Sequence, residues 1–145
     1  MSFENPGDGA VRELLEGARR VAVVGLSPKP WRTSNQIAGF LQQCGYQVIP
    51  VYPRGDEILG QRVYRSVAEI PGGVDLVDVF RRSEALDEVA VDAVAAKAPA
   101  LWFQLGCVHE AAAERATAAG ATVVMDRCIL VEHRRLLGSG WRVPS

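Results

Sequence analysis

The feature that most constrains the fold is the apolar run Val21–Val24, which stops at Gly25 and is followed by a loop and a helical pattern. A strand that is apolar at every position suits a sheet that is covered on both faces, as parallel sheets are. Helices alternate with further predicted strands, which lie at 48–51, 74–80, 100–104 and 122–125. This alternation is typical of right-handed crossovers, so we predict an α/β fold with a doubly wound, mainly parallel, five-stranded sheet of the Rossmann-like type.

The segments between these strands carry helical patterns. Apolar residues recur at helical spacing from Ile37 to Cys44. The four residues Thr33–Gln36 have the order of a capping box, and Gly45 is a typical C-terminal stop. We predict further helices at about 83–94, 109–119 and 129–137, and a short helical turn at 66–70.

A chain of 145 residues is long enough for a single domain with its own core. We expect residues 1–18 to form an N-terminal helix, capped by Asp8, that packs on the domain. Residues 19–137 should form the ligand-binding domain itself, and residues 138–145 a loose C-terminal tail. The sequence shows no internal repeat and no second domain.

Net charge and cysteine usage exclude several classes of partner. Sixteen Lys and Arg residues against seventeen Asp and Glu residues give a net charge of −1, which argues against nucleic acid or an anionic membrane. No apolar run approaches the roughly 20 residues that span a bilayer, and the N-terminus lacks the layout of a signal peptide. The cysteines Cys44, Cys107 and Cys128 are far apart and form no CxxC pair. They indicate reduced thiols in a cytoplasmic protein, with neither a disulfide frame nor a metal site.

The loop after the first strand, from Gly25 to Arg32, has the features of a phosphate-binding loop. In a doubly wound sheet, ligands bind outside the carboxyl ends of the strands, where the strand order reverses. Glycine allows a close approach of the backbone to a phosphate, and the helix that begins near Thr33 presents unpaired amides. Hydroxyl and cationic donors come from Ser27, Lys29, Arg32, Thr33 and Ser34. Loops of similar composition also occur without a ligand, so the pattern alone leaves that alternative open.

The surrounding residues narrow the choice of nucleotide. The NAD fingerprint GxGxxG keeps only its first glycine here, because Ser27 and Pro30 occupy the other two positions. The second strand is followed by Tyr52-Pro53-Arg54, without the carboxylate that binds ribose hydroxyls. Arg54 could instead receive the ribose phosphate of NADP or of coenzyme A (CoA). The missing glycines and the missing carboxylate disfavour NAD, so NADP and CoA remain. The P-loop signature of nucleoside triphosphate sites is absent as well.

Five segments, taken in order, resemble a known family. They are Val24–Pro30, Val51–Pro53, Val77–Arg82, Trp102–Gly106 and Val124–Cys128. Over about residues 19–136 the chain is similar to the small bacterial stand-alone CoA-binding domain proteins. These are similar in fold to the N-terminal CoA-binding domain of the succinyl-CoA synthetase alpha subunit. The chain departs from the pattern at Tyr52, where such proteins often have Asn, and at Cys107, which follows the QxG segment.

The resemblance implies that CoA lies across the carboxyl ends of the first four strands. By this likeness the first loop and helix start would contribute Gly25, Leu26, Ser27, Pro28, Lys29, Arg32, Thr33 and Ser34. The later segments would contribute Tyr52, Pro53, Arg54, Val79, Phe80, Arg81, Arg82, Gln104, Leu105 and Gly106. The bulk of Tyr52 could alter the contact with the adenine end.

We expect no catalytic centre. The synthetase needs a phosphorylated histidine and an ATP-grasp partner, and neither His109 nor His133 lies in a second domain that could play that part. Cys107 and His109 could form a thiol–imidazole dyad, because a helix N-terminus lowers the pKa of a thiol; chance spacing at a turn is the alternative. Cys107 beside the thiol of CoA would also permit a mixed disulfide under oxidation.

We prefer a structural interpretation to a catalytic one for three aspartates, Asp75, Asp78 and Asp126. The adjacent residues Asp126 and Arg127 are expected to pair and to fix the C-terminal segment. Asp75 and Asp78 are expected to cap loops and to pair with the arginines at 81–82. Side chains three residues apart on a strand point to opposite faces, so these two carboxyls cannot act together as acid and base.

The sequence therefore predicts a CoA or acyl-CoA binding protein that acts alone, as a homodimer, or with an unidentified partner enzyme. An NADP-binding oxidoreductase or redox sensor that uses the same crevice is the alternative from another class. A CoA-dependent enzyme whose chemistry comes from another chain is a third.

Overall fold

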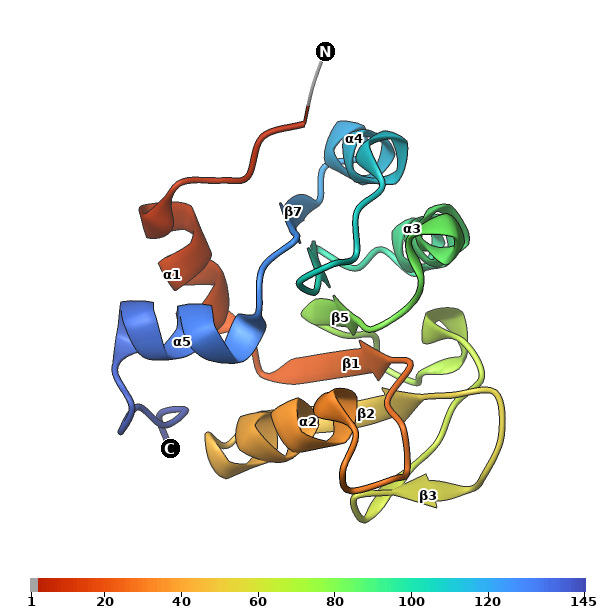
Figure 1. Ribbon diagram of the computed structural model, residues 1–145, viewed down its shortest axis with the longest axis vertical. Coiled ribbons are helices and arrows are strands. Elements are labelled where there is room, and N and C mark those ends of the chain that lie inside the picture. Colours follow the sequence, from red (N-terminus) through yellow and green to blue (C-terminus); the bar gives the residue numbers. More distant parts are fainter. Residues whose placement is uncertain (1–2) are drawn as a thin grey trace.

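The computed structural model describes residues 3–145 and has an α/β fold around one parallel sheet (Figure 1). The strands of this sheet are β1 (Arg20–Val24), β2 (Gln47–Val51), β5 (Leu76–Val79), β6 (Ala100–Phe103) and β7 (Thr122–Met125). Their order is β2-β1-β5-β6-β7, and every neighbouring pair is parallel. The predicted sheet is confirmed, although its third strand is shorter than the expected range 74–80.

The α-helices within residues 3–145 are α1 (Asp8–Gly17), α2 (Thr33–Gln43), α3 (Leu86–Ala95), α4 (Glu110–Ala118) and α5 (Ile129–Leu137). Helices α1, α2 and α5 cover one face of the sheet, and α3 and α4 cover the other (Figure 1). Two short 3-10 helices, η1 (Val67–Glu69) and η2 (Ser83–Ala85), precede α3 in the chain. The helices and the helical turn predicted from the sequence are confirmed. None of the described helices is long and apolar enough to cross a membrane.

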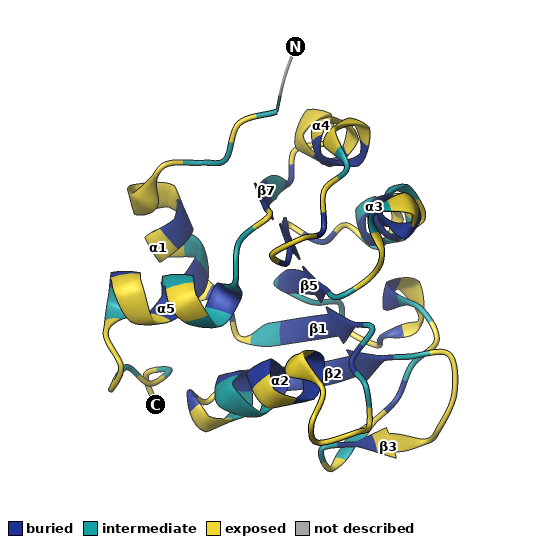
Figure 2. Cartoon of the chain, viewed as in Figure 1, coloured by how far each residue is buried: buried dark blue, intermediate teal, exposed yellow. Residues whose placement is uncertain are grey.

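Each face of the sheet carries an apolar core, which explains the uninterrupted apolar run in β1. Val21 and Val23 pack toward α1, α2 and α5, whereas Ala22 and Val24 pack toward α3 and α4. In Figure 2 the strands are buried over most of their length, and the helices turn a buried side inward and an exposed side outward. Alternate residues of one strand therefore serve two different cores, so every position has to be apolar.

The helix starts differ from the expected caps. Asp8 is the first residue of α1 and follows the N-cap Gly7, so its side chain does not cap the helix. The N-cap of α2 is Arg32, and no side chain caps this helix, which makes the predicted capping box wrong. Ser34 and Asn35 at the start of α2 bind the preceding loop instead.

The segment between β2 and β5 contains a hairpin that the sequence pattern did not predict. Strands β3 (Glu57–Ile58) and β4 (Gln61–Arg62) pair antiparallel. The chain then returns along β2, where the amide of Tyr64 donates to the carbonyl of Pro50 and the amide of Tyr52 to the carbonyl of Tyr64. Pro50 lies in an edge strand of the main sheet, where its missing N–H is tolerated.

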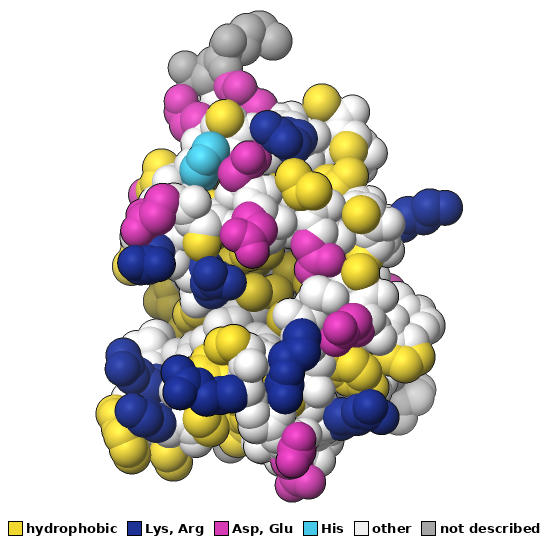
Figure 3. Space-filling view, turned by 90° about the vertical axis from the view of Figure 1, so that its right-hand side faces the viewer, with side chains coloured by type: hydrophobic (Ala, Val, Ile, Leu, Met, Phe, Trp, Pro, Cys, Tyr) yellow, Lys and Arg dark blue, Asp and Glu magenta, His cyan; other side chains and the backbone are white. Residues whose placement is uncertain are grey.

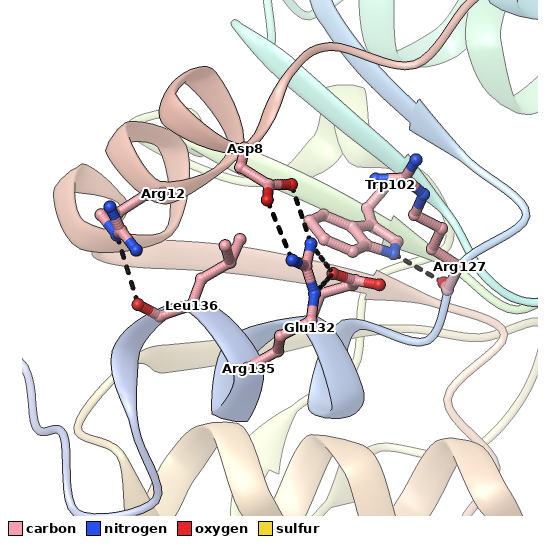
Figure 4. A network of polar contacts seen from close by, with 7 residues as sticks. All are labelled: Asp8, Arg12, Trp102, Arg127, Glu132, Arg135 and Leu136. Atoms are coloured by element: carbon pink, nitrogen blue, oxygen red, sulfur yellow. Dashed lines mark hydrogen bonds and ion pairs between the residues drawn. The ribbon is translucent and has the colours of Figure 1, made fainter.

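The N-terminal helix α1 is attached to the C-terminal helix α5 by a network of polar contacts (Figure 4). Arg135 of α5 donates to both carboxylate oxygens of Asp8, at 2.8 and 2.9 Å, and also pairs with Glu132. The Nε of Arg12 donates to the carbonyl of Leu136 at 3.2 Å. The Asp8 side chain, expected to cap its own helix, therefore joins two helices.

Residues 138–145, which we expected to be loose, are anchored at two points. The ring of Trp141 packs on Tyr46 and edge-on against His133, with ring centroids 5.8 and 5.2 Å apart. The amide of Val143 donates to the carbonyl of Cys44, just beyond the end of α2, at 2.7 Å. The expectation of a loose tail is wrong for this part of it.

Candidate functional site

The strand order reverses between β1 and β5, which is where doubly wound sheets open a crevice for ligands. After β1 the chain forms β2 on one side of β1, and it then crosses over to form β5 on the other side of β1. Val24, at the end of β1, is in register with Val51 of β2 and Val79 of β5. The loops that follow these three strands therefore meet at one edge of the sheet.

Gly25 is required by this meeting of loops. Its φ of +82° lies in the left-handed region, and a Cβ at this position would lie 2.1 Å from the carbonyl oxygen of Phe80. The amide of Phe80 donates to the carbonyl of Val24, which extends the pairing of β1 and β5 by one step. We predicted that Gly25 allows a phosphate to approach the backbone. In the structure, its missing side chain allows the loop after β5 to pack closely against it.

The loop between β1 and α2 is held in shape by the helix that follows it. The amide of Ser27 donates to the Oγ of Ser34 at 3.0 Å, and the Nδ2 of Asn35 donates to the carbonyl of Ser27 at 2.9 Å. The Oγ of Ser27 accepts from the amide of Lys29 at 3.2 Å. Ser34 and Asn35 are both buried, so the loop is preformed against the start of α2.

A pocket of about 650 Å³ lies between this loop and the loops after β2 and β5; we call it the α2 pocket. Its lining contains three cationic side chains, those of Lys29, Arg32 and Arg82, and no carboxylate. The lining residues are Gly25, Ser27, Lys29, Arg32, Thr33, Ser34, Tyr52, Phe80 and Arg82. Arg82 also makes an exposed ion pair with Glu84 at 3.7 Å. The first three amides of α2 (33–35) have no hydrogen-bond partner among residues 3–145, as is usual for the first turn of a helix. The pocket is therefore suited to an anion.

A second cavity of about 530 Å³ lies toward the α3 side of the same edge; we call it the α3 cleft. It is lined by Val24, Gly25, Val51, Tyr52, Pro53, Arg65, Ser66, Phe80, Arg81, Glu88, Val89 and Asp92. Gly25, Tyr52 and Phe80 belong to both cavities, so the two are neighbours across the switch point. Figure 3 shows the carboxyl-end face of the molecule, which is hollowed near its middle over hydrophobic side chains. Most of the Lys and Arg side chains in that view gather below the hollow, and most Asp and Glu lie above it.

The structure brings together eleven of the residues predicted to contact CoA, and it places the others elsewhere. Leu26, Val79 and Gln104 are buried, and Leu105 is 69% exposed. Pro28, Arg54 and Gly106 are exposed but line neither cavity. The sequence analysis missed the cleft residues Arg65, Ser66, Glu88, Val89 and Asp92, which come from the loop before η1 and from α3. No local pattern marks these five, because the crossing from β2 to β5 brings the first two to Gly25 and the packing of α3 on the sheet brings the other three.

Asp78 and Gln104 form a polar pair inside the domain. Asp78 is fully buried, its Oδ1 accepts from the Nε2 of Gln104 at 2.5 Å, and its Oδ2 has no partner within residues 3–145. Burial raises the pKa of the Asp78 carboxyl to about 7. Asp75 accepts from the backbone amides of Arg19 and Arg20. The predicted pairing of these aspartates with the arginines at 81–82 is wrong.

The thiol–imidazole dyad that we weighed against chance spacing does not form. Cys107 is buried in the core under α3 and α4, and this burial raises the pKa of its thiol, opposite to the expected lowering. The Nδ1 of His109 accepts from the amide of Ala112 at 3.0 Å, so the imidazole caps α4. A buried thiol with a raised pKa is also a poor partner for a mixed disulfide with CoA.

The predicted pair of Asp126 and Arg127 is replaced by two separate contacts. The Oδ1 of Asp126 accepts from the amide of Gly106 at 2.8 Å. The carbonyl of Arg127 accepts from the Nε1 of the buried Trp102 at 2.8 Å (Figure 4). Both contacts fix the chain after β7. Asp126 and Arg127 therefore have the expected structural role, but through these two contacts and not through an ion pair with each other.

A third cavity lies away from the switch point. It measures about 720 Å³ and lies against α1, α4 and the start of β7, at the opposite edge of the sheet. Its ionisable lining residues are Glu4 and Glu114, and the rest is mainly apolar. Carboxylates without a cation disfavour a phosphate, so this cavity is a poor site for a nucleotide.

Comparisons with known proteins agree on the family. The family model described as a CoA binding domain matches residues 19–134. The uncharacterized protein YneT of Bacillus subtilis is 45% identical over 131 residues, which are 90% of this chain and 97% of YneT. A solved structure described as a hypothetical protein from Pyrococcus horikoshii OT3 is 37% identical, with a TM-score of 0.88, and covers 95% of this chain and 100% of that one.

A larger protein contains a similar fold. The dinucleotide-forming acetyl-coenzyme A synthetase 1 of Ca. Korarchaeum cryptofilum, solved in its apo form, is 25% identical with a TM-score of 0.70. The match covers 79% of this chain and 27% of that chain. This chain therefore corresponds to about a quarter of the synthetase.

Proposed function

Because this chain belongs to the CoA-binding domain family, we propose that it binds CoA or an acyl-CoA at the carboxyl ends of β1, β2 and β5, without a catalytic centre of its own. The observation that carries the proposal is the α2 pocket, which combines three cations, the free first amides of a helix and no lining carboxylate. CoA carries a diphosphate and a 3′-phosphate, so it presents the anions that such a pocket favours.

The roles of individual residues follow from where they lie. Lys29 and Arg32 supply charge from the preformed loop, and Arg82 supplies it from the loop after β5. These side chains are exposed, so each should contribute about 1 kcal/mol, or about a fivefold change in affinity. The amides that begin α2 add donors that need no side-chain ordering.

The absence of a catalytic centre is proposed from the environment of the candidate groups. Cys107 is buried, His109 caps α4, and Asp126 holds the amide of Gly106. The thiol is therefore shielded from a ligand, and the other two side chains are held by structural hydrogen bonds. Where CoA chemistry is needed, a partner enzyme would supply it. The three unpaired cysteines agree with a location in the reducing cytoplasm.

Calorimetric titration with CoA, acetyl-CoA, NAD, NADP and ATP tests the proposal. We expect saturable binding of CoA or acetyl-CoA, and a weaker affinity in Lys29→Ala and in Arg32→Ala. Arg142→Ala is the matched control, because it removes the same charge from the exposed tail, where the guanidinium donates a hydrogen bond to the neighbouring carbonyl of Trp141. Clear binding of NADP with no response to CoA would overturn the proposal.

A further inference from the structure

The α3 cleft is the natural continuation of the α2 pocket for a long ligand. Gly25, Tyr52 and Phe80 line both cavities, so the two cavities adjoin each other at these three residues. CoA is an extended molecule with chemically different parts, and the two cavities differ in charge and polarity. The charges of their linings can therefore indicate which part of CoA lies in which cavity.

Charge disfavours the phosphates in the α3 cleft. The cleft holds two carboxylates, Glu88 and Asp92, whereas the α2 pocket holds none. Of the two arginines in the cleft, Arg65 donates to the carbonyls of Tyr52 and Gly55 and so holds the loop after β2. The other, Arg81, lies beside Gly25, at the junction with the α2 pocket.

The rest of the α3 cleft suits a flat, largely apolar ring. Val24, Val51 and Val89 are 5–6% exposed and form part of its wall. Tyr52 and Phe80, each half-buried, border it on the side of the switch point. A base inserted among these side chains would be covered by apolar groups, as small-molecule rings in pockets generally are.

Glu88 is the carboxylate in this cleft that is free to meet a ligand. The oxygens of Asp92 accept from the amides of Val67 and Ala68, at 2.8 and 3.3 Å, and so fix η1 against α3. Glu88 lies four residues earlier, on the same side of α3. It is exposed and makes no ion pair or side-chain hydrogen bond with any residue in the range 3–145.

We propose that the α3 cleft holds the adenine base of CoA, and that Glu88 selects adenine by accepting a hydrogen bond from its 6-amino group. This assignment rests on the proposed function. A carboxylate has acceptors only, so it matches the amino group of adenine and opposes the 6-oxygen of hypoxanthine or guanine. Glu88 is thus a specificity-determining residue that no segment of the family resemblance includes.

The test compares CoA with its deaminated analogue, in which hypoxanthine replaces adenine. We expect the wild-type protein to bind CoA about tenfold more tightly than the analogue, the loss that follows when a hydrogen bond to a charged group is replaced by an unmatched acceptor. In Glu88→Gln the preference should fall to about twofold or less, because an amide can turn to offer either an acceptor or a donor. Glu16→Gln, the same change at an exposed position of α1, should leave the preference unchanged.

The outcomes separate this assignment from the proposed function. If wild-type protein binds CoA and its deaminated analogue equally well, or if Glu88→Gln keeps the full preference, the assignment of Glu88 is overturned while CoA binding stands. If the wild-type protein binds neither compound, the proposed function itself fails. A melting temperature like that of the wild type shows that Glu88→Gln is folded, as expected for an exposed side chain without partners.

Discussion

Replacing Asp78 by Asn should change how the stability of the protein depends on pH. The carboxyl is fully buried, its Oδ2 has no partner within residues 3–145, and burial raises its pKa from 3.8 to about 7. Between about pH 4 and pH 7 the folded state keeps the proton that the unfolded state releases. The folded state then binds more protons, so the free energy of unfolding falls as the pH rises. At about 1.36 kcal/mol per pH unit, the loss attributable to Asp78 is about 4 kcal/mol.

Asp78→Asn removes this loss and keeps the Oδ1 that accepts from Gln104. The amide nitrogen takes the place of the unpartnered oxygen, which can shift the stability of the variant by a constant amount at every pH. We therefore compare differences: the stability of the variant relative to the wild type should rise by about 4 kcal/mol between pH 4 and pH 8. Urea unfolding followed by circular dichroism at several pH values measures it. Other titrating groups cancel in the difference, because both proteins contain them.

A difference that stays flat from pH 4 to pH 8 would refute the reasoning. It would mean that Asp78 takes up no more protons in the folded state than in the unfolded one. A difference that falls with pH would have the wrong sign and would require a cation that stabilises the carboxylate in the folded state.

Two further predictions concern stability. Burial lowers the pKa of His133 from 6.5 to about 4. Between these two pH values the imidazole is protonated in the unfolded protein but stays neutral in the folded one. Wild-type stability relative to His133→Phe should therefore fall by about 3 kcal/mol from pH 7 to pH 4, and a flat difference in urea unfolding would contradict this. Gly25→Ala should cost about 2–4 kcal/mol in the same assay, because its Cβ would lie 2.1 Å from the carbonyl oxygen of Phe80 at a positive φ. Gly55→Ala has a similar φ with no atom within 4 Å, so it should cost about 1 kcal/mol; equal costs would refute the role of the close approach.

Much of the fold can be predicted from the sequence because its signals are local. The apolar run in β1 and the helical spacing from Ile37 to Cys44 depend only on neighbours in the chain. Contacts of polar side chains were predicted less well, since they depend on which strands become neighbours. The predicted capping box at Thr33–Gln36 does not form, whereas Ser34 binds the amide of Ser27 in the preceding loop. Asp78 meets Gln104 because β5 lies beside β6.

The candidate site was predictable in part for the same reason. The loop that begins at Gly25 and the start of α2 adjoin each other in the chain, so their cations and hydroxyls could be recognised together. Arg65 and Glu88 reach the site only through the crossing from β2 to β5 and through the start of α3. The expected lowering of the pKa of the Cys107 thiol was wrong, because a helix N-terminus is visible in a sequence, whereas the burial that raises this pKa is not.

The central claim, that the phosphates of CoA lie in the α2 pocket, is tested most directly by titrating CoA into the wild type and into the variant with both Lys29→Ala and Arg32→Ala. At about 0.05 M salt we expect the variant to bind CoA at least about tenfold more weakly. The difference should shrink at about 0.5 M salt, where screening weakens ionic contacts between exposed groups. An affinity for CoA that is equal in the two proteins at low salt would contradict the claim and place the phosphates elsewhere.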